Sequence, residues 1–204
     1  MRTQKLADYL LFKQAFEMIK NKEHLTLEGL TKIVAIKASI NKGLPDVLKE
    51  AFPDVEPVKR LSAVNKKIPD PNWLVGFTTG EGCFLVKIKK SSASKSGVQV
   101  LLRFQVTQHS RDTELMKSLV SYLDCGQIYS SSAEGEAVNF TVERFSDITD
   151  KIIPFFDKYP IEGVKAFDFA DLKRVAELMK NKAHLTADGL EVILKLKAGM
   201  NRGR

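Results

Sequence analysis

The sequence holds few of the residues that build disulfides and metal clusters, and it has no long apolar run. It has two cysteines, Cys83 and Cys125, three histidines and one tryptophan. Two cysteines in different contexts fit free thiols in a reducing compartment better than a disulfide framework or a zinc site. No apolar run approaches the ~18 residues that span a bilayer, so no membrane partner is expected. The first residues lack the apolar core of a signal peptide, and Asp8 and Glu17 argue against a transit peptide.

Acidic residues are also in the minority. Lysine and arginine total 32 against 25 aspartates and glutamates, which gives a net charge of +7 and a pI near 9.3. A basic balance favours a polyanionic partner without establishing one. The apolar fraction of 44% and the charged fraction of 28% are ordinary for a globular chain, and 204 residues allow one large domain or two small ones.

A duplication relates the two ends of the chain. Residues 5–43 match residues 165–203 at roughly 17 of about 39 positions, far above chance. Each copy predicts two helices, the second of which begins after an N-cap threonine. A histidine precedes that helix in both copies, at His24 and His184, and a capping or packing role is favoured over a metal site.

The strands that precede the second copy have no counterpart before the first copy. We therefore expect residues 1–43 to be the C-terminal helical pair of a first domain and residues 71–204 to be a complete domain. Residues 44–70 carry four prolines among charged residues, which predicts a linker with a short helix near 45–51.

The middle of the chain changes from a helical period to strict alternation. Strands are predicted at 83–90, 98–107, 126–131 and 137–143, and helices at 71–81, 111–123 and 147–157. This order predicts an α+β domain in which helices cover the apolar face of a four-stranded antiparallel sheet.

The opposite face of this sheet is rich in Lys, Arg, Gln and Asn and poor in acids. Lys and Arg neutralise phosphates, while Arg, Gln and Asn read base edges in the major groove, which admits a β-ribbon. Nucleic acid is favoured over an ordinary solvated face. The candidate DNA-binding residues are Leu85, Lys87, Lys89, Gln99, Leu101, Arg103, Gln105, Tyr129, Ser131, Asn139 and Thr141.

Residues 70–82, Asp-Pro-Asn-Trp-Leu-Val-Gly-Phe-Thr-Thr-Gly-Glu-Gly, predict a short helix with clear start and stop signals. Asp70 suits the N-cap, and Pro71 suits the first helical position. Gly82 is expected to adopt the left-handed conformation that ends many helices.

Three residues of this segment lower the stability that the helix would have on its own. Gly76 and Gly80 lie four positions apart on one face, and each costs about 1 kcal/mol relative to Ala. Glu81 lies in the last turn, where the helix end is already partly negative. The glycines predict a close helix partner and Glu81 a functional acid, whereas the plain alternative is a small core helix with a surface Glu.

Residues 74–84, Leu-Val-Gly-Phe-Thr-Thr-Gly-Glu-Gly-Cys-Phe, resemble the signature of LAGLIDADG homing endonucleases. The segments Phe-Gln-Val-Thr-Gln-His at 104–109 and Phe-Ser-Asp-Ile-Thr-Asp-Lys-Ile-Ile-Pro at 145–154 are similar to later segments of that family. The resemblance covers essentially the whole chain and is closest to single-chain, intron-encoded members of fungal mitochondria. It implies a mitochondrial protein with an αββαββα domain, preceded here by a two-helix remnant of a duplicated domain.

The resemblance also implies an activity. Members of this family hydrolyse phosphodiesters at a double-stranded DNA site of roughly 20 base pairs, about two helical turns. Glu81 matches the metal-binding acid, with Gly80 beside it, and Mg²⁺, or another divalent cation such as Ca²⁺ or Mn²⁺, is the implied cofactor. Gln108 matches a position that orients water, and Lys151 a basic residue near the scissile phosphate. Gly76 and Gly80 match the helix–helix interface, whereas Thr79 departs from the motif's first Asp.

One departure is large, because single-chain members carry two motif helices and this sequence shows one. Three explanations stand. The chain is completed by a separate LAGLIDADG half, or it pairs with a second copy of itself through Gly76 and Gly80, or it is a non-catalytic nucleic-acid-binding protein such as an intron maturase or an inactive relic. A purely structural α+β protein is a further alternative.

Overall fold

The computed structural model describes residues 5–60, 68, 70–92, 94, 97–130 and 136–203. The chain divides into two compact units, Met1–Lys66 and Lys67–Arg204, and each is described by itself. Ser131, a candidate DNA contact, lies outside the described residues, as do residues 61–67 and 69 of the expected linker. Within the described part of the chain, no helix is long and apolar enough to cross a membrane.

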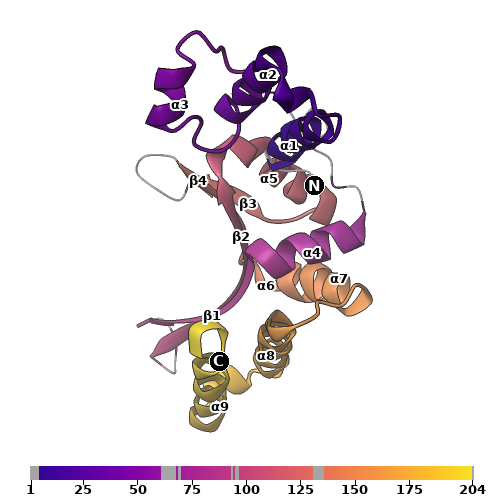
Figure 1. Cartoon of the computed structure of the whole chain (residues 1–204). Helices are drawn as coiled ribbons and strands as arrows, with labels where there is room; N and C mark the ends of the chain where they lie inside the picture. Colours follow the sequence, from indigo (N-terminus) through magenta and orange to yellow (C-terminus); the bar gives the residue numbers. More distant parts are fainter. Residues whose placement is uncertain are drawn as a thin grey trace. The chain divides into compact units, whose positions relative to one another are not determined.

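The first unit is helical (Figure 1). Its elements are α1 (Lys5–Lys20), η1 (Glu23–Leu25), α2 (Leu27–Ala38) and α3 (Asp46–Ala51). The side chain of Thr26 accepts a hydrogen bond from the Gly29 amide at 3.1 Å, so the predicted N-cap is confirmed. A small core of Leu11, Met18 and Ile36 holds α1 against α2.

Residues that follow the helical pair pack onto it. The Ser39 hydroxyl donates to the Val58 carbonyl at 2.7 Å, and Arg60 forms an ion pair with Asp8 at 2.7 Å. Val58 also packs against the core of the first unit. Residues 44–60 of the expected linker therefore belong to the first unit, whereas Ile68 packs in the core of the second.

The second unit has the predicted order of helices and strands (Figure 1). It begins with α4 (Pro71–Glu81), β1 (Gly82–Lys90), β2 (Val98–His109), η2 (Ser110–Asp112), α5 (Thr113–Leu123), β3 (Gln127–Ser130) and β4 (Ala137–Val142). It continues with α6 (Phe145–Asp147), the π-helical turn η3 (Ile148–Ile152), α7 (Ile153–Lys158), α8 (Val164–Lys180), η4 (Ala183–Leu185), α9 (Ala187–Ala198) and η5 (Asn201–Gly203).

The four strands form one antiparallel sheet in the order β1-β2-β4-β3. Phe84 of β1 lies opposite Phe104 of β2, and Val106 of β2 lies opposite Phe140 of β4. These side chains are buried beneath the helices, and Phe169 of α8 lies against Phe84 with ring centroids 5.4 Å apart. The predicted α+β fold is confirmed, and the apolar face of the sheet is the core of this unit.

The start of α4 agrees with the sequence prediction, but its end does not. Asp70 accepts a hydrogen bond from the Trp73 amide at 3.0 Å, as an N-cap does. Gly82, expected to be left-handed, has φ −83° and ψ 161° because β1 begins at this residue. A Cβ at Gly82 would lie 2.6 Å from Cγ2 of Thr78, so glycine is required here for close packing.

Candidate nucleic-acid interface and active site

Glu81 is the last residue of α4 and is exposed, directly before the first residue of β1. The Gly80 carbonyl belongs to the last helical turn, where carbonyl groups lack intrahelical partners. The Glu81 carboxylate and the Gly80 carbonyl therefore both lie at the end of this helix. Both are oxygen donors of the kind that Mg²⁺ and Ca²⁺ prefer.

Lys165, near the start of α8, holds the same helix end. Its ammonium group donates to the Thr78 carbonyl at 3.2 Å and also to the Gly82 carbonyl. A cation at a helix C-terminus is favourable, and here it offsets the negative charge that Glu81 adds. Lys165 was not among the predicted site residues, although it aligns with Lys5 at the start of the repeat.

Gln108 lies near the end of β2, at the same end of the β1–β2 ladder as Glu81. The ladder pairs Gly82 with Val106, so Glu81 precedes the first residue of β1 and Gln108 follows its partner by two positions. This register places Glu81, the predicted metal ligand, and Gln108, the predicted water-orienting amide, at one end of the β1–β2 ladder.

The outer face of the sheet carries a hydrogen-bonded layer of polar side chains. Arg103 donates to Glu143 at 2.5 Å and to Gln105 at 3.2 Å. Gln105 donates to Asn139 at 3.1 Å, and the Thr107 hydroxyl donates to Asn139 at 2.6 Å. These contacts fix guanidinium and amide groups in defined positions, which suits the reading of base edges.

The other predicted outer-face residues lie in register with this layer. Leu85 lies opposite Arg103, Lys87 opposite Leu101, and Lys89 opposite Gln99. Burial lowers the pKa of Lys87, and the charge of Arg103 lowers that pKa further. Tyr129 of β3 is opposite Asn139 and is exposed.

Thr141 is the least exposed of the predicted DNA contacts that the structure describes. It lies on the outer face between Gln105 and Gln127, its partners in the register, but only 6% of its surface is exposed. Thr141 also lines the hollow that Gln127, Tyr129 and Glu143 border. Its contact with DNA stays a prediction.

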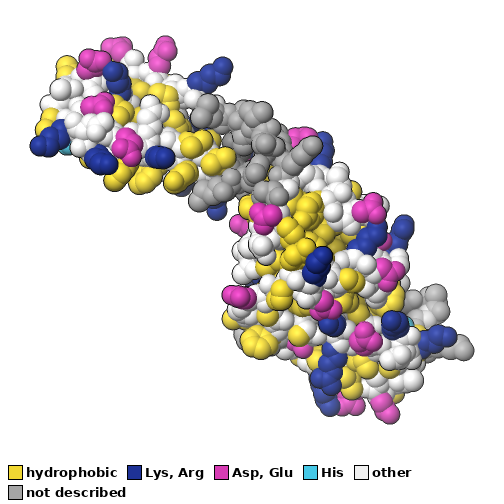
Figure 2. Space-filling view, turned by 90° about the vertical axis from the view of Figure 1, so that its right-hand side faces the viewer, with side chains coloured by type: hydrophobic (Ala, Val, Ile, Leu, Met, Phe, Trp, Pro, Cys, Tyr) yellow, Lys and Arg dark blue, Asp and Glu magenta, His cyan; other side chains and the backbone are white. Residues whose placement is uncertain are grey.

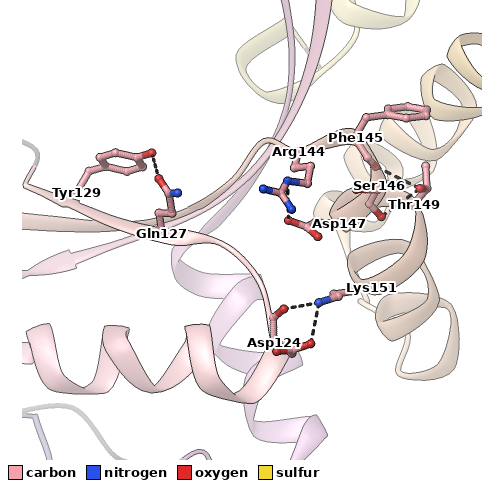
Figure 3. Close-up of polar contacts among 9 residues, drawn as sticks. All are labelled: Asp124, Gln127, Tyr129, Arg144, Phe145, Ser146, Asp147, Thr149 and Lys151. Carbon is pink, nitrogen blue, oxygen red and sulfur yellow. Dashed lines mark hydrogen bonds and ion pairs between the residues drawn. The ribbon is translucent and has the colours of Figure 1, made fainter.

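Lys151 lies at a separate corner, where η3 meets the turn after α5 (Figure 3). Its ammonium donates to the Asp124 carboxylate at 2.8 Å and to the Asp124 carbonyl. The hydrogen bond from Lys151 lowers the pKa of Asp124, and the reciprocal contact raises the pKa of Lys151. Both residues line a hollow of about 350 Å³ together with Tyr129, Arg144 and Asp147.

The glycine face of α4 is open. A Cβ added at Gly76 or at Gly80 would meet no atom of the described chain within 4 Å, leaving out the helix's own nearby backbone. Nothing in the described residues therefore requires glycine at either position. This openness agrees with a face that packs against another backbone outside the described residues.

The donor set at the end of α4 fits one half of a divalent-cation site. Glu81 and Gly80 supply two hard oxygen ligands. Among the described residues there is no group of three or more His, Cys, Asp and Glu side chains that could hold a metal ion.

The signature helix, the four-stranded sheet and the polar outer face define an α+β fold of the homing-endonuclease class. I-SmaMI, a LAGLIDADG homing endonuclease solved bound to cleaved DNA, superposes on this chain with a TM-score of 0.97 and 52% identity, over 100% of this chain and 68% of that one. Another I-SmaMI structure, bound to uncleaved DNA target in the presence of calcium ions, superposes with a TM-score of 0.95 and 52% identity, over 98% and 68% of the two chains. The family model described as LAGLIDADG endonuclease matches residues 74–176. The chain belongs to the LAGLIDADG endonuclease family.

Two curated relatives extend this result. Probable intron-encoded endonuclease 3 of Neurospora crassa is 44% identical over 192 residues, which is 94% of this chain. Probable intron-encoded endonuclease 2 of the same fungus is 40% identical over 205 residues, or 96% of this chain. The chain spans only 36% and 44% of the length of these two relatives.

Proposed function

We propose that this chain is one half of a site-specific double-stranded DNA endonuclease, a subunit or fragment that hydrolyses phosphodiesters after a second motif helix completes it. The observation that carries the proposal is the position of Glu81. It ends the family's signature helix and directly precedes the strand whose outer face carries Lys87 and Lys89. Family membership and the likeness to DNA-bound I-SmaMI support the same reading.

The sheet's outer face is the proposed reader of DNA. Lys87 and Lys89 neutralise phosphates, and the layer of Arg103, Gln105 and Asn139 contacts base edges. Leu85, Leu101, Gln99 and Tyr129 complete the proposed surface. The proposed target is a site of roughly 20 base pairs, of which one sheet covers about one helical turn.

Glu81 and the Gly80 carbonyl would hold the divalent cation, with Mg²⁺ as the proposed cofactor. When bound, Mg²⁺ lowers the pKa of a coordinated water and neutralises charge on the attacked phosphate. Gln108, at the same end of the β1–β2 ladder, would orient water there. Lys165 keeps the helix end in place, while Lys151 remains the residue that the resemblance assigns to the scissile phosphate.

The second motif helix would pack on the glycine face of α4. Gly76 and Gly80 allow close backbone approach, and both are open in the described structure. We propose that a second LAGLIDADG half supplies this helix together with a partner for Glu81. In this proposal residues 71–204 form one complete domain, and residues 1–43 are the C-terminal helices of another domain, whose motif helix and strands the second half supplies. Residues 44–70 connect the two domains. The mitochondrial location implied by the resemblance is part of the same proposal.

Cleavage by a completed enzyme tests the function. The third of I-SmaMI that this chain does not match, here called the complementing segment, is fused in front of the full chain. The fusion is incubated with a pool of randomised plasmids and Mg²⁺, and linear products are recovered and sequenced. We expect recurrent cut sites that disappear with Glu81→Gln. Cleavage of both strands that survives Glu81→Gln would refute the metal assignment.

A second candidate function is DNA or RNA binding without cleavage, as in an intron maturase or an inactive relic. The observation that favours it is that Glu81 is the one acid at the end of α4, and that the described residues contain no group of three or more His, Cys, Asp and Glu side chains that could hold a metal ion. Tight, salt-dependent binding by the fusion, with no metal-dependent cutting at any site, would support this candidate.

A further inference from the structure

The helix α1 exposes a row of large apolar side chains. Tyr9, Phe12, Phe16 and Ile19 are 49%, 63%, 54% and 48% exposed. Their spacing of three and four residues places them on one face of the helix, which we call the α1 stripe. The buried residues of α1, such as Leu11 and Met18, lie on a different face, against α2.

The duplication allows the α1 stripe to be compared with the equivalent residues of α8. Tyr9, Phe12, Phe16 and Ile19 align with Phe169, Leu172, Ala176 and Met179 of α8. In the second unit these four pack into the core beneath the sheet, and Leu172 and Ala176 are 0% and 2% exposed. The same helix positions thus cover a sheet in the second unit and are exposed in the first.

The contacts of α8 specify what the missing surface must offer. Phe169, the counterpart of Tyr9, lies 5.4 Å from Phe84 of β1, centroid to centroid. The ammonium of Lys173, the counterpart of Lys13, lies 2.7 Å from the Asp157 carboxylate of α7. Lys13 makes no ion pair with any described residue. The surface that fits the α1 stripe is therefore an aromatic-bearing sheet face with a carboxylate beside it.

The α1 stripe is also hollowed. Tyr9, Phe12 and Phe16, with Lys13 and Glu17, line a depression of about 340 Å³. Figure 2 shows hydrophobic side chains gathered along one edge of the first unit, in the upper left of the view. An apolar depression between charged side chains can accept a protruding side chain from a partner.

We propose that the α1 stripe is a docking surface for the apolar face of a second LAGLIDADG sheet, built like β1–β4 of this chain. A second copy of this chain does not fit, because its own sheet face is already covered by α8. This inference rests on the proposed function, since the same second half would supply the second motif helix. It adds a separate contact, through α1, that places that half without using the glycine face of α4.

The test uses the full chain and the complementing segment as two separate polypeptides, without DNA or metal. Association is measured by sedimentation, and amide hydrogen exchange is compared with and without the segment. We expect a one-to-one complex and at least tenfold slower exchange in α1. The double variant Phe12→Ser/Phe16→Ser should weaken association at least tenfold.

The matched control is Leu25→Ser/Leu27→Ser, which removes two exposed apolar residues of the same unit outside the stripe. The equivalents of these residues, Leu185 and Ala187, are also exposed in the second unit, so the control should bind like the unchanged chain. Equal weakening by both double variants, self-association through the stripe, or unchanged exchange in α1 would overturn the inference.

Two further readouts keep the outcome decisive. Binding of an apolar dye by the full chain alone should fall in Phe12→Ser/Phe16→Ser and not in the control; equal dye binding by all three proteins would overturn the inference even if the segment fails to fold. Docking without cleavage would leave the stripe assignment intact while refuting nuclease activity. Cleavage by the fusion without slower exchange in α1 would support nuclease activity and refute the stripe assignment.

Discussion

The ammonium nitrogen of Lys165 lies 3.2 Å from the carbonyl oxygen of Thr78, across 87 positions of sequence. The same ammonium reaches the Gly82 carbonyl, so a residue at the start of α8 closes the last turn of the signature helix. Glu81 lies between those two carbonyls in sequence. The position of the proposed metal ligand therefore depends on a contact between two distant elements.

Replacing Lys165 separates positioning from DNA binding. We predict that Lys165→Met in the fusion enzyme lowers the single-turnover cleavage rate about 10²-fold, a typical cost of removing one preorganised electrostatic contact. DNA affinity measured with Ca²⁺ should change by less than threefold. Lys173→Met is the matched control, because it removes another lysine of α8, one whose ammonium pairs with Asp157 and not with the end of α4. An equal loss of cleavage rate in both variants would contradict the positioning role of Lys165.

Gly76 of α4 and Gly82, the first residue of β1, should respond to alanine in opposite directions. Gly76→Ala should raise the free energy of unfolding of this chain by about 0.5–1 kcal/mol, since its Cβ meets open space and glycine disfavours the helix. Gly82→Ala should lower the free energy of unfolding by about 1–3 kcal/mol, because its Cβ would overlap Thr78. Urea denaturation of both variants measures the two effects. A destabilised Gly76→Ala would show that the face is already occupied.

The glycine face should matter for assembly more than for folding. Gly76→Leu is expected to abolish cleavage by the fusion enzyme while the isolated chain keeps its circular dichroism spectrum. The larger side chain blocks close approach of a second backbone without touching the core. Unchanged cleavage by Gly76→Leu would refute the helix–helix interface.

Arg103 and Lys89 should differ in what they contribute to DNA binding. Arg103→Ala is predicted to cost about 1–3 kcal/mol at one base pair and to relax specificity there. Lys89→Ala should weaken binding to all sequences alike and reduce the salt slope by about one. Competition binding with single-base variants of a selected site measures both. Equal losses on every sequence in Arg103→Ala would mean that Arg103 contacts only phosphate.

Cys125 predicts a loss of stability at alkaline pH. Burial raises the pKa of its thiol to about 11, and the charge of Asp147 adds to that rise. The unfolded thiol ionises near pH 8.5–9, so between that pH and about 11 the folded state holds a proton that the unfolded state has lost. The free energy of unfolding should therefore fall with rising pH, by about 2–3 kcal/mol for this group. Cys125→Ala should flatten the slope, and an equal slope in the variant would contradict the assignment.

The sequence predicts those parts of the fold that neighbouring residues decide. The Asp70 cap, the Thr26 cap and the alternation of Phe84, Val86 and their partners depend on short-range pattern, and the structure confirms them. The prediction that Gly82 is left-handed was wrong because β1 begins at this residue. Glycine is required there instead for close packing against Thr78.

Residues whose role depends on distant contacts could not be predicted in the same way. Lys165 reaches α4 only once α8 has packed on the sheet, and the low exposure of Thr141 arises in a strand that is paired on both sides. The one sequence signal for Lys165 was its match with Lys5 in the duplication. The α1 stripe was similarly visible only when the exposure of two equivalent helices was compared.

The central claim is that the outer face of the sheet reads a DNA sequence. Selection of duplexes from a fully randomised library by the purified full chain, in Ca²⁺ at low salt, tests this claim without a second half. We predict enrichment of one consensus of about one helical turn, roughly 10 base pairs, that Arg103→Ala blurs at one position. Recovery of a library no different from the input, despite salt-dependent retention of DNA, would contradict sequence reading by this sheet.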